Sequence, residues 1–283
     1  MKSVQKRVAA IHDLSGFGKC SLSIILPVLS SMGHEVCCVP TAVLSSHTGG
    51  LPDVTVRDLT PEMRGFLRQW KELQIPFDSI YTGFLSSIEQ IEIVQDFIRT
   101  FRRKDTLVMV DPAMADNGSL YRTYTKEMAE GTAKLCTQAD VVVPNITEAA
   151  LLLGEPYREG PYTRTWVEKT LHRLTELGPQ VAVLTGVWFA PELLGAAAYD
   201  RVSGEVSYAL SYHVPGGYHG SGDLFASVLL GALLDGENLR NSLQLAVDST
   251  VGAIHRTYKA GADPQWGIHF EQELPRLMRQ IGL

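Results

Sequence analysis

The stretch Gly217-Tyr218-His219-Gly220-Ser221-Gly222-Asp223-Leu224-Phe225-Ala226-Ser227 leads from a glycine-rich turn into an apolar segment that predicts a helix over 224–234. Glycines before a helix let backbone N–H groups converge on an anion, and the helix N-terminus adds partial positive charge. An acid follows at once, and a carboxylate opposes an anion there unless it does chemistry. The pattern favours a base, Asp223, that takes a hydroxyl proton while the N–H groups of Gly220, Ser221 and Gly222 hold a phosphoryl group. An ordinary capped helix start is the alternative interpretation.

Two familiar phosphate-binding motifs do not fit this turn. No Gly-Lys-Ser/Thr follows it, as a Walker A loop requires. No strand runs directly into it and it lies near the C-terminus, which disfavours a dinucleotide fingerprint. Other parts of the sequence are needed to distinguish a catalytic anion site from an ordinary capped helix start.

Length and composition exclude several classes of protein. The 283 residues are 45% hydrophobic and 20% charged, which is typical of a globular protein rather than a disordered one. The net charge of −6 argues against a nucleic-acid binder. No apolar run approaches the roughly 20 residues of a membrane span, and the first residues lack the apolar core of a signal peptide. Four cysteines without CxxC spacing indicate a reducing compartment, so we expect a cytoplasmic protein.

Strand-like and helix-like segments alternate along most of the chain, which predicts a mostly parallel sheet covered by helices. The predicted strands are 8–11, 36–39, 79–82, 107–110, 141–143 and 181–184. The predicted helices are 22–32, 61–73, 88–101, 125–137, 147–153, 165–177, 224–234 and 239–258. Segments 196–199 and 206–211 flank a turn and predict a β-hairpin. With no linker-like composition and no internal repeat, residues 1–283 are interpreted as a single domain.

Polar residues follow most of the predicted strands. In an open parallel sheet, ligands bind at the carboxyl ends of the strands, so these residues are candidates for one common site. Individually each could be an ordinary turn or cap residue. They are Asp13, Ser15, Thr41, the segment 45–50, Gly83, Phe84, Asp111, Asp116, Asn145, Glu148, Thr185 and Gly186.

Five segments, taken in order, resemble the pyridoxal kinase family of vitamin B6 salvage, within the ribokinase-like superfamily, and the chain looks like a bacterial pyridoxal/pyridoxamine kinase. The resemblance covers nearly the whole sequence. The segments are Ile11-His12-Asp13-Leu14-Ser15-Gly16-Phe17-Gly18, Ser45-Ser46-His47-Thr48-Gly49-Gly50, Asp111-Pro112-Ala113-Met114-Ala115-Asp116, Val143-Pro144-Asn145-Ile146-Thr147-Glu148 and Gly220-Ser221-Gly222-Asp223-Leu224-Phe225-Ala226.

The resemblance implies a three-layer α/β/α fold and an enzyme that uses ATP to phosphorylate the 5′-hydroxymethyl group of pyridoxal, pyridoxamine or pyridoxine. By position, Asp223 is the base and the turn Gly220–Gly222 is the anion hole. ATP contacts fall on Asp116, Asn145, Glu148, Thr185, Gly186 and Val214. Substrate contacts fall on Asp13, His47, Thr48, Phe84 and Asp223. Asp111 and Glu148 support Mg²⁺, and a monovalent cation and a homodimer are common in the family.

The chain departs from the family at two positions. Asp13 stands where the best-known members carry serine, and Thr185 stands where some carry lysine. Asp13 is also similar to the Gly-Ser-Asp loop of hydroxymethylpyrimidine kinases, which phosphorylate a similar alcohol. That enzyme and a non-catalytic B6- or nucleotide-binding protein therefore stay open as alternatives. Nothing points to nucleic acid or membrane as a partner, and the loop 45–58 is the predicted lid.

Overall fold

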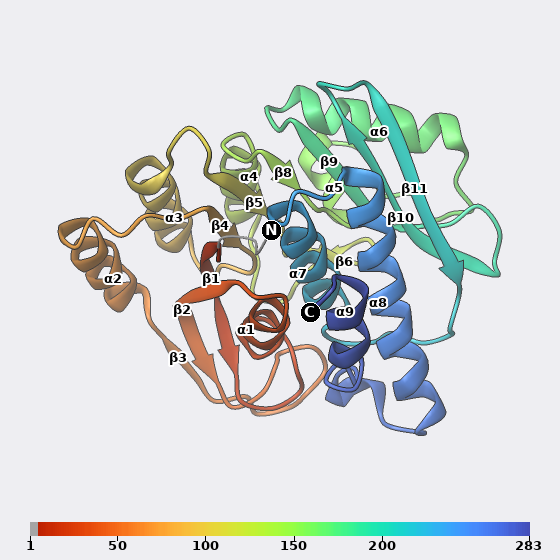
Figure 1. Cartoon of the computed structure of the whole chain (residues 1–283), viewed down its shortest axis with the longest axis horizontal. Coiled ribbons are helices and arrows are strands. Elements are labelled where there is room, and N and C mark those ends of the chain that lie inside the picture. Colours follow the sequence, from red (N-terminus) through yellow and green to blue (C-terminus); the bar gives the residue numbers. More distant parts are fainter. Residues whose placement is uncertain (1–4) are drawn as a thin grey trace.

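The computed structural model describes residues 5–283, in which nine strands form one sheet in the order β11-β10-β9-β8-β5-β4-β1-β2-β3 (Figure 1). The strands are β1 (Arg7–Ser15), β2 (Glu35–Leu44), β3 (Val56–Asp58), β4 (Ser79–Thr82), β5 (Leu107–Val110), β6 (Ala115–Asp116), β7 (Ser119–Leu120), β8 (Val141–Val142), β9 (Val181–Val187), β10 (Leu193–Asp200) and β11 (Glu205–Tyr212). The helices are α1 (Leu22–Ser31), α2 (Thr60–Glu72), α3 (Ile88–Phe101), α4 (Lys126–Cys136), α5 (Ile146–Leu153), α6 (Arg164–Glu176), α7 (Ser221–Leu234), α8 (Leu239–Lys259) and α9 (Leu274–Gln280), with a 3₁₀ turn at Pro264–Trp266.

The centre of the sheet is parallel and its two margins are antiparallel. Strands β2, β1, β4, β5, β8 and β9 run the same way. The predicted hairpin is β10–β11, which extends the sheet beyond β9, and β3 closes the other edge. Strands β6 and β7 form a separate small hairpin. The predicted α/β class with a mostly parallel sheet is confirmed.

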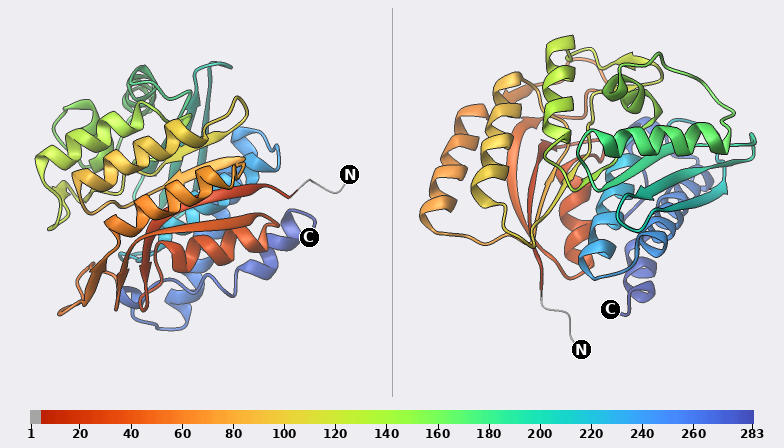
Figure 2. Two further views of the ribbon diagram at one scale, coloured as in Figure 1. Left: turned by 90° about the vertical axis from the view of Figure 1, so that its left-hand side faces the viewer. Right: turned by 90° about the horizontal axis from the view of Figure 1, so that it is seen from above.

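A helical layer covers each face of the sheet (Figure 2). Successive residues of β1 point to opposite faces of the sheet. Val8 and Ala10 belong to the hydrophobic core shared with α1, α7 and α8, whereas Ala9 and Ile11 belong to the core shared with α3, α4 and α6. A strand buried on both faces needs such an unbroken apolar run. The two cores account for the three-layer arrangement that the resemblance implied.

Helix α7 packs between α1 and α8 in one helical layer. Its residues from Leu224 to Ala232 are buried all round, as expected of a helix that is apolar on every side. The helix begins at Ser221 and not at Leu224, because Gly220 is its N-cap. Asp223 therefore lies inside the first turn of α7, so the position of the helix fixes the position of Asp223.

Strand β1 is the place where the strand order reverses. The chain passes from β1 to β2 on one side, and after β3 and α2 it returns to β4 on the other side of β1. Ligands of open α/β sheets bind outside the carboxyl ends of strands at such a switch point. The fold therefore directs attention to the residues that follow β1 and β4.

The stretch 45–58, predicted as a loop, ends in a short strand. Residues Val56–Asp58 pair with β2 as β3, with Leu44 opposite Val56. All three residues of β3 are exposed, so no burial pattern marks them in the sequence. The lid and the single domain both remain predictions. Across residues 5–283 no helix combines the length and the apolar character needed to cross a membrane.

Candidate active site

Four acids from four separate parts of the chain form a connected electrostatic group at the carboxyl edge of the sheet. Asp13 lies in β1, Asp111 follows β5, Glu148 lies in the first turn of α5 and Asp223 in the first turn of α7. Asp13 raises the pKa of Asp223, Asp223 raises that of Asp111, and Asp111 raises that of Glu148. The acids that the sequence singled out after separate strands are thus brought together.

The N-terminus of α7 offers unpaired donors. Gly220 has a φ of 82°, and its N–H and that of Gly222 find no partner within residues 5–283. The N–H of Ser221 instead donates to the Tyr218 carbonyl at 3.3 Å, and the Ser221 hydroxyl donates to the same oxygen at 2.8 Å. Free N–H groups at the start of a buried helix suit an anion, so this turn can receive a phosphoryl group.

Asp223 stands beside those donors. Its pKa is raised to about 7 by burial and by the charge of Asp13, against the Ser21 backbone N–H, which lowers it. A general base works best when its pKa lies near the working pH, because it is then both ionised and basic. The side chain can accept a hydroxyl proton at neutral pH.

Asp111 and Glu148 form the second half of the acid group. Burial, followed by the charge of Asp223, raises the pKa of Asp111 to about 8. Glu148 is 3% exposed, and burial and then Asp111 raise its pKa. Its Oε1 accepts the Met114 N–H at 3.1 Å and its Oε2 the Asn145 N–H at 2.8 Å. Glu148 is therefore held in a fixed position with an acceptor lone pair left on each oxygen.

The described part of the chain contains no group of three or more His, Cys, Asp or Glu side chains that could hold a metal ion. Mg²⁺ is commonly bound by one or two carboxylates together with substrate phosphates and water. Burial raises the pKa values of Asp111 and Glu148, and Asp111 also raises that of Glu148. Two such carboxyl groups next to an anion-receiving turn fit that kind of shared site. Asp111 and Glu148 are the residues that could support the ion.

The residues assigned to ATP line a strip from β6 to β9 (Asp116, Asn145, Thr185 and Gly186), with Val214 in the loop between β11 and α7. Asn145 Oδ1 caps α5 by accepting the Glu148 N–H at 2.9 Å, and its Nδ2 donates to the Ala115 carbonyl at 2.8 Å. Asn145 and Thr185 are direct backbone neighbours. The Asn145 side chain therefore also shapes this strip.

Besides Asp223, the residues assigned to the substrate come from β1 and from the segments that follow β2 and β4. His47 is buried, although a lone histidine in a polar loop is more often solvated: its Nδ1 accepts the Gly49 N–H at 3.1 Å and its Nε2 contacts the Gln265 carbonyl at 2.6 Å. Since Nδ1 accepts, Nε2 carries the proton. The ring stacks on His219 at 4.3 Å, which joins the 45–50 segment to the turn before α7. Thr48 is exposed, and Phe84 lies 6.0 Å from the Tyr124 ring.

Two residues of this region were missed by the sequence analysis. Tyr121 follows the β6–β7 hairpin, lies 6.4 Å from the Phe84 ring, and has its pKa raised by burial and then by Glu148, Asp116, Asp111 and Asp223. Ser21 precedes α1 and bonds to Asp13. Two-residue strands leave no sequence pattern that would have placed Tyr121, and Ser21 resembles an ordinary N-cap.

The raised pKa values of the acids predict how stability depends on pH. Asp223 and Asp111 hold protons up to about pH 7 and 8 in the folded chain, against an ordinary value of 3.8. As the pH rises from 3.8, the unfolded chain releases these protons first, so the free energy of unfolding falls until about pH 8. Urea unfolding of the ligand-free protein should give a lower midpoint at pH 8 than at pH 5, with a smaller difference in Asp111→Asn. A midpoint that rises over this interval would contradict the acid cluster.

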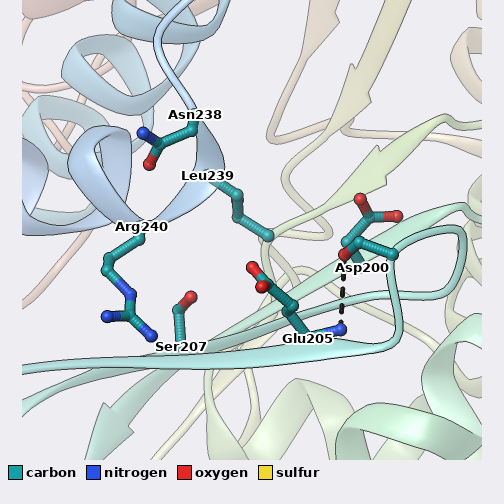
Figure 3. A pocket seen from close by; sticks show the side chains of 7 residues that line it. Asp200, Glu205, Ser207, Asn238, Leu239 and Arg240 are labelled. Carbon is teal, nitrogen blue, oxygen red and sulfur yellow. Dashed lines mark hydrogen bonds between the residues drawn. The ribbon is translucent and has the colours of Figure 1, made fainter.

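A depression of about 450 Å³ lies away from the four acids (Figure 3). It is lined by Asp200, Ser203, Glu205, Ser207, Asn238, Leu239 and Arg240, from the tip of the β10–β11 hairpin and the start of α8. Asp200 pairs with Val181, the first residue of β9. The depression is therefore at the amino edge of the parallel strands, opposite the acids, and is no part of this site.

Comparison with known proteins places the chain among kinases. Residues 26–266 match the family described as phosphomethylpyrimidine kinase. A Bacteroides thetaiotaomicron protein named for that family, crystallised with pyridoxal, is 41% identical, with a TM-score of 0.93 over 97% of this chain and 96% of its own. Pyridoxal kinase from Lactobacillus plantarum is 31% identical, with a TM-score of 0.89 over 98% of both chains. The pyridoxine/pyridoxal/pyridoxamine kinase of Bordetella bronchiseptica is 26% identical over 90% of both chains.

Proposed function

Because this chain belongs to the phosphomethylpyrimidine kinase family, we propose that it uses ATP to phosphorylate the 5′-hydroxymethyl group of a B6 vitamer: pyridoxal, pyridoxamine or pyridoxine. The family and the kinase relatives support phosphoryl transfer, and a 41% identical protein crystallised with pyridoxal supports the B6 ring. The observation that carries the proposal is Asp223, a carboxyl group with a pKa raised to about 7 beside the unpaired N–H groups of Gly220 and Gly222.

The reaction follows from that arrangement. The Asp223 carboxylate takes the proton of the vitamer's 5′-hydroxyl, and the hydroxyl oxygen forms a bond to the terminal phosphorus of ATP. The bond from that phosphorus to the bridging oxygen breaks, and ADP leaves with the electron pair. The N–H groups at the start of α7 hold the equatorial oxygens as negative charge spreads over them, so catalysis consists of positioning and charge stabilisation.

The same proposal assigns the surrounding residues. The strip of Asp116, Asn145, Thr185, Gly186 and Val214 binds ATP, and Asp13, His47, Thr48 and Phe84 face the vitamer ring. Asp111 and Glu148 would hold Mg²⁺, which would offset the repulsion between their carboxylates and the ATP phosphates. A monovalent cation near the turn and a homodimer are proposed from family resemblance alone. The four free cysteine thiols support a cytoplasmic location.

Two alternatives make different predictions. A hydroxymethylpyrimidine kinase would perform the same transfer on a pyrimidine alcohol, and Asp13 is the residue that favours it. A non-catalytic binding protein would have no use for a base with a pKa near 7. The pyridoxal kinase names of the 31% and 26% identical relatives favour the B6 vitamers as substrates.

One assay separates the three functions. ADP release is followed with ATP, MgCl₂ and each candidate alcohol in turn: pyridoxal, pyridoxamine, pyridoxine and 4-amino-5-hydroxymethyl-2-methylpyrimidine. We expect turnover with at least one B6 vitamer and a product heavier by one phosphate in mass spectrometry. Turnover with the pyrimidine alone would replace the proposal by the thiamine-type kinase. Tight vitamer binding without ADP release would replace it by the binding protein.

A further inference from the structure

Ser21 makes the shortest side-chain contact to Asp13. Its Oγ donates to Asp13 Oδ1 at 2.6 Å, a distance typical of a hydroxyl bonded to a charged carboxylate. Ser15 Oγ donates to the other oxygen, Oδ2, at 3.1 Å. Asp13 is 5% exposed, so the two hydroxyls hold a buried carboxyl group by both of its oxygens.

The turn that carries Ser21 also packs against the start of α7. A Cβ added to Gly220 would lie 2.3 Å from the Lys19 carbonyl oxygen and 2.5 Å from Ile24 Cδ1, so the two segments are in direct contact. The backbone N–H of Ser21 favours the ionised form of Asp223, which lies in α7, the helix that Gly220 caps. Ser21 therefore influences two acids: its hydroxyl bonds to Asp13, and its backbone N–H lowers the pKa of Asp223.

The backbone conformation of Ser21 indicates that the bond from its hydroxyl to Asp13 explains why a serine occupies this position. Its φ of 50° and ψ of −132° lie in a region that glycine adopts far more easily than serine. Ser21 is the N-cap of α1, yet its side chain makes no capping hydrogen bond. A strained serine that does not cap its helix is explained by the bond to Asp13.

We propose that Ser21 is a positioning residue that fixes Asp13 relative to Asp223, so that the group facing the vitamer ring and the group facing its hydroxyl keep a constant separation. This inference rests on the proposed function. Its chemical meaning is that ring binding places the 5′-hydroxyl on the base. A small displacement of either acid costs turnover, because proton transfer needs hydrogen-bond distance in a productive pose.

The test compares two glycine substitutions in the same turn. Ser21→Gly removes the hydroxyl and relieves the backbone, and we expect kcat/KM for the vitamer to fall roughly a hundredfold with an unchanged or higher Tm. Lys19→Gly relieves a similar backbone, with a φ of 49°, and loses an ion pair to Glu271 and a cation–π contact with the Phe270 ring, neither of which involves the four acids. We expect Lys19→Gly to keep the wild-type kcat/KM.

A pH profile supplies a readout that a merely structural role would not move. The Ser21 hydroxyl lowers the pKa of Asp13, whose other neighbours are Ser15, Asp223, Cys20 and His47. Ser21→Ala keeps the strained backbone but raises the pKa of Asp13, because the hydroxyl that lowered it is gone. The part of the acidic limb of kcat/KM that reports ionisation of Asp13 should therefore move to higher pH. In Lys19→Gly it should stay in place.

The outcomes separate this inference from the function on which it rests. Absence of turnover in the wild-type protein refutes the function itself. An active wild type with unimpaired Ser21→Gly overturns only the positioning role. Parallel losses of Tm and activity in Ser21→Gly and Ser21→Ala, with an unmoved pH profile, also overturn it, because they mark a purely structural serine.

Discussion

Asp223→Asn should lower kcat for vitamer phosphorylation by about a thousandfold, within the range by which a general base accelerates a reaction. Asparagine keeps the shape of the side chain but cannot take the hydroxyl proton. Vitamer binding should change little or improve, because the substitution removes a buried group whose charge is costly there. Steady-state kinetics measures the loss of kcat. Fluorescence titration with the vitamer measures the affinity.

The matched control is Asp235→Asn at the other end of the same helix. Asp235 is the C-cap residue of α7 and approaches His34 rather than any of the four acids. Its replacement should leave kcat unchanged. Equal losses in the two variants would mean that Asp223 acts through the helix and not on the substrate. Full activity in Asp223→Asn would refute its role as the base.

The elements that the sequence predicted best are those whose ends carry local signals. Helix α3 has its predicted bounds, Ile88–Phe101, because Ser87 accepts the Gln90 N–H as an N-cap. Strands β4 and β5 also match: β4 is buried at all four residues, and β5 is a short apolar run.

Strand β2 is longer than the predicted strand 36–39. It continues through Pro40 to Leu44, beyond the predicted end at residue 39. Proline lacks the N–H that a central strand needs, but Pro40 lies beside an irregularity in the β1–β2 register between His12 and Leu14. The irregularity accommodates the residue, and nothing in the local sequence announces it.

The residues of the candidate site also fall into two groups, those that the sequence predicted and those that it did not. Asp13, Asp111, Glu148 and Asp223 each follow or begin a recognisable element, so the parallel-sheet rule could group them before any coordinates were known. Ser21 and Tyr121 could not be found this way. Ser21 is distinguished only by its backbone angles and its bond to Asp13, and the position of Tyr121 depends on a hairpin of two-residue strands. Both are consequences of tertiary structure rather than of a local pattern.

Gly220→Ala is expected to damage fold and catalysis together. The new Cβ would lie 2.3 Å from the Lys19 carbonyl oxygen, and a φ of 82° disfavours any side chain. Because that neighbour is backbone, the start of α7 must move away and take Asp223 and the unpaired N–H groups with it. We expect a loss of about 2–4 kcal/mol in the free energy of unfolding and roughly a hundredfold in kcat.

Gly236→Ala isolates the cost of the backbone angle in this comparison. Gly236 follows α7 with a φ of 86°, and a Cβ there meets nothing within 4 Å. It should lose only about 1–2 kcal/mol of stability, the usual cost of a left-handed residue, and no activity. Urea unfolding and steady-state kinetics on both variants measure the difference. If Gly220→Ala behaves like Gly236→Ala in both, close packing of the α1 turn against α7 does not hold the catalytic turn in place.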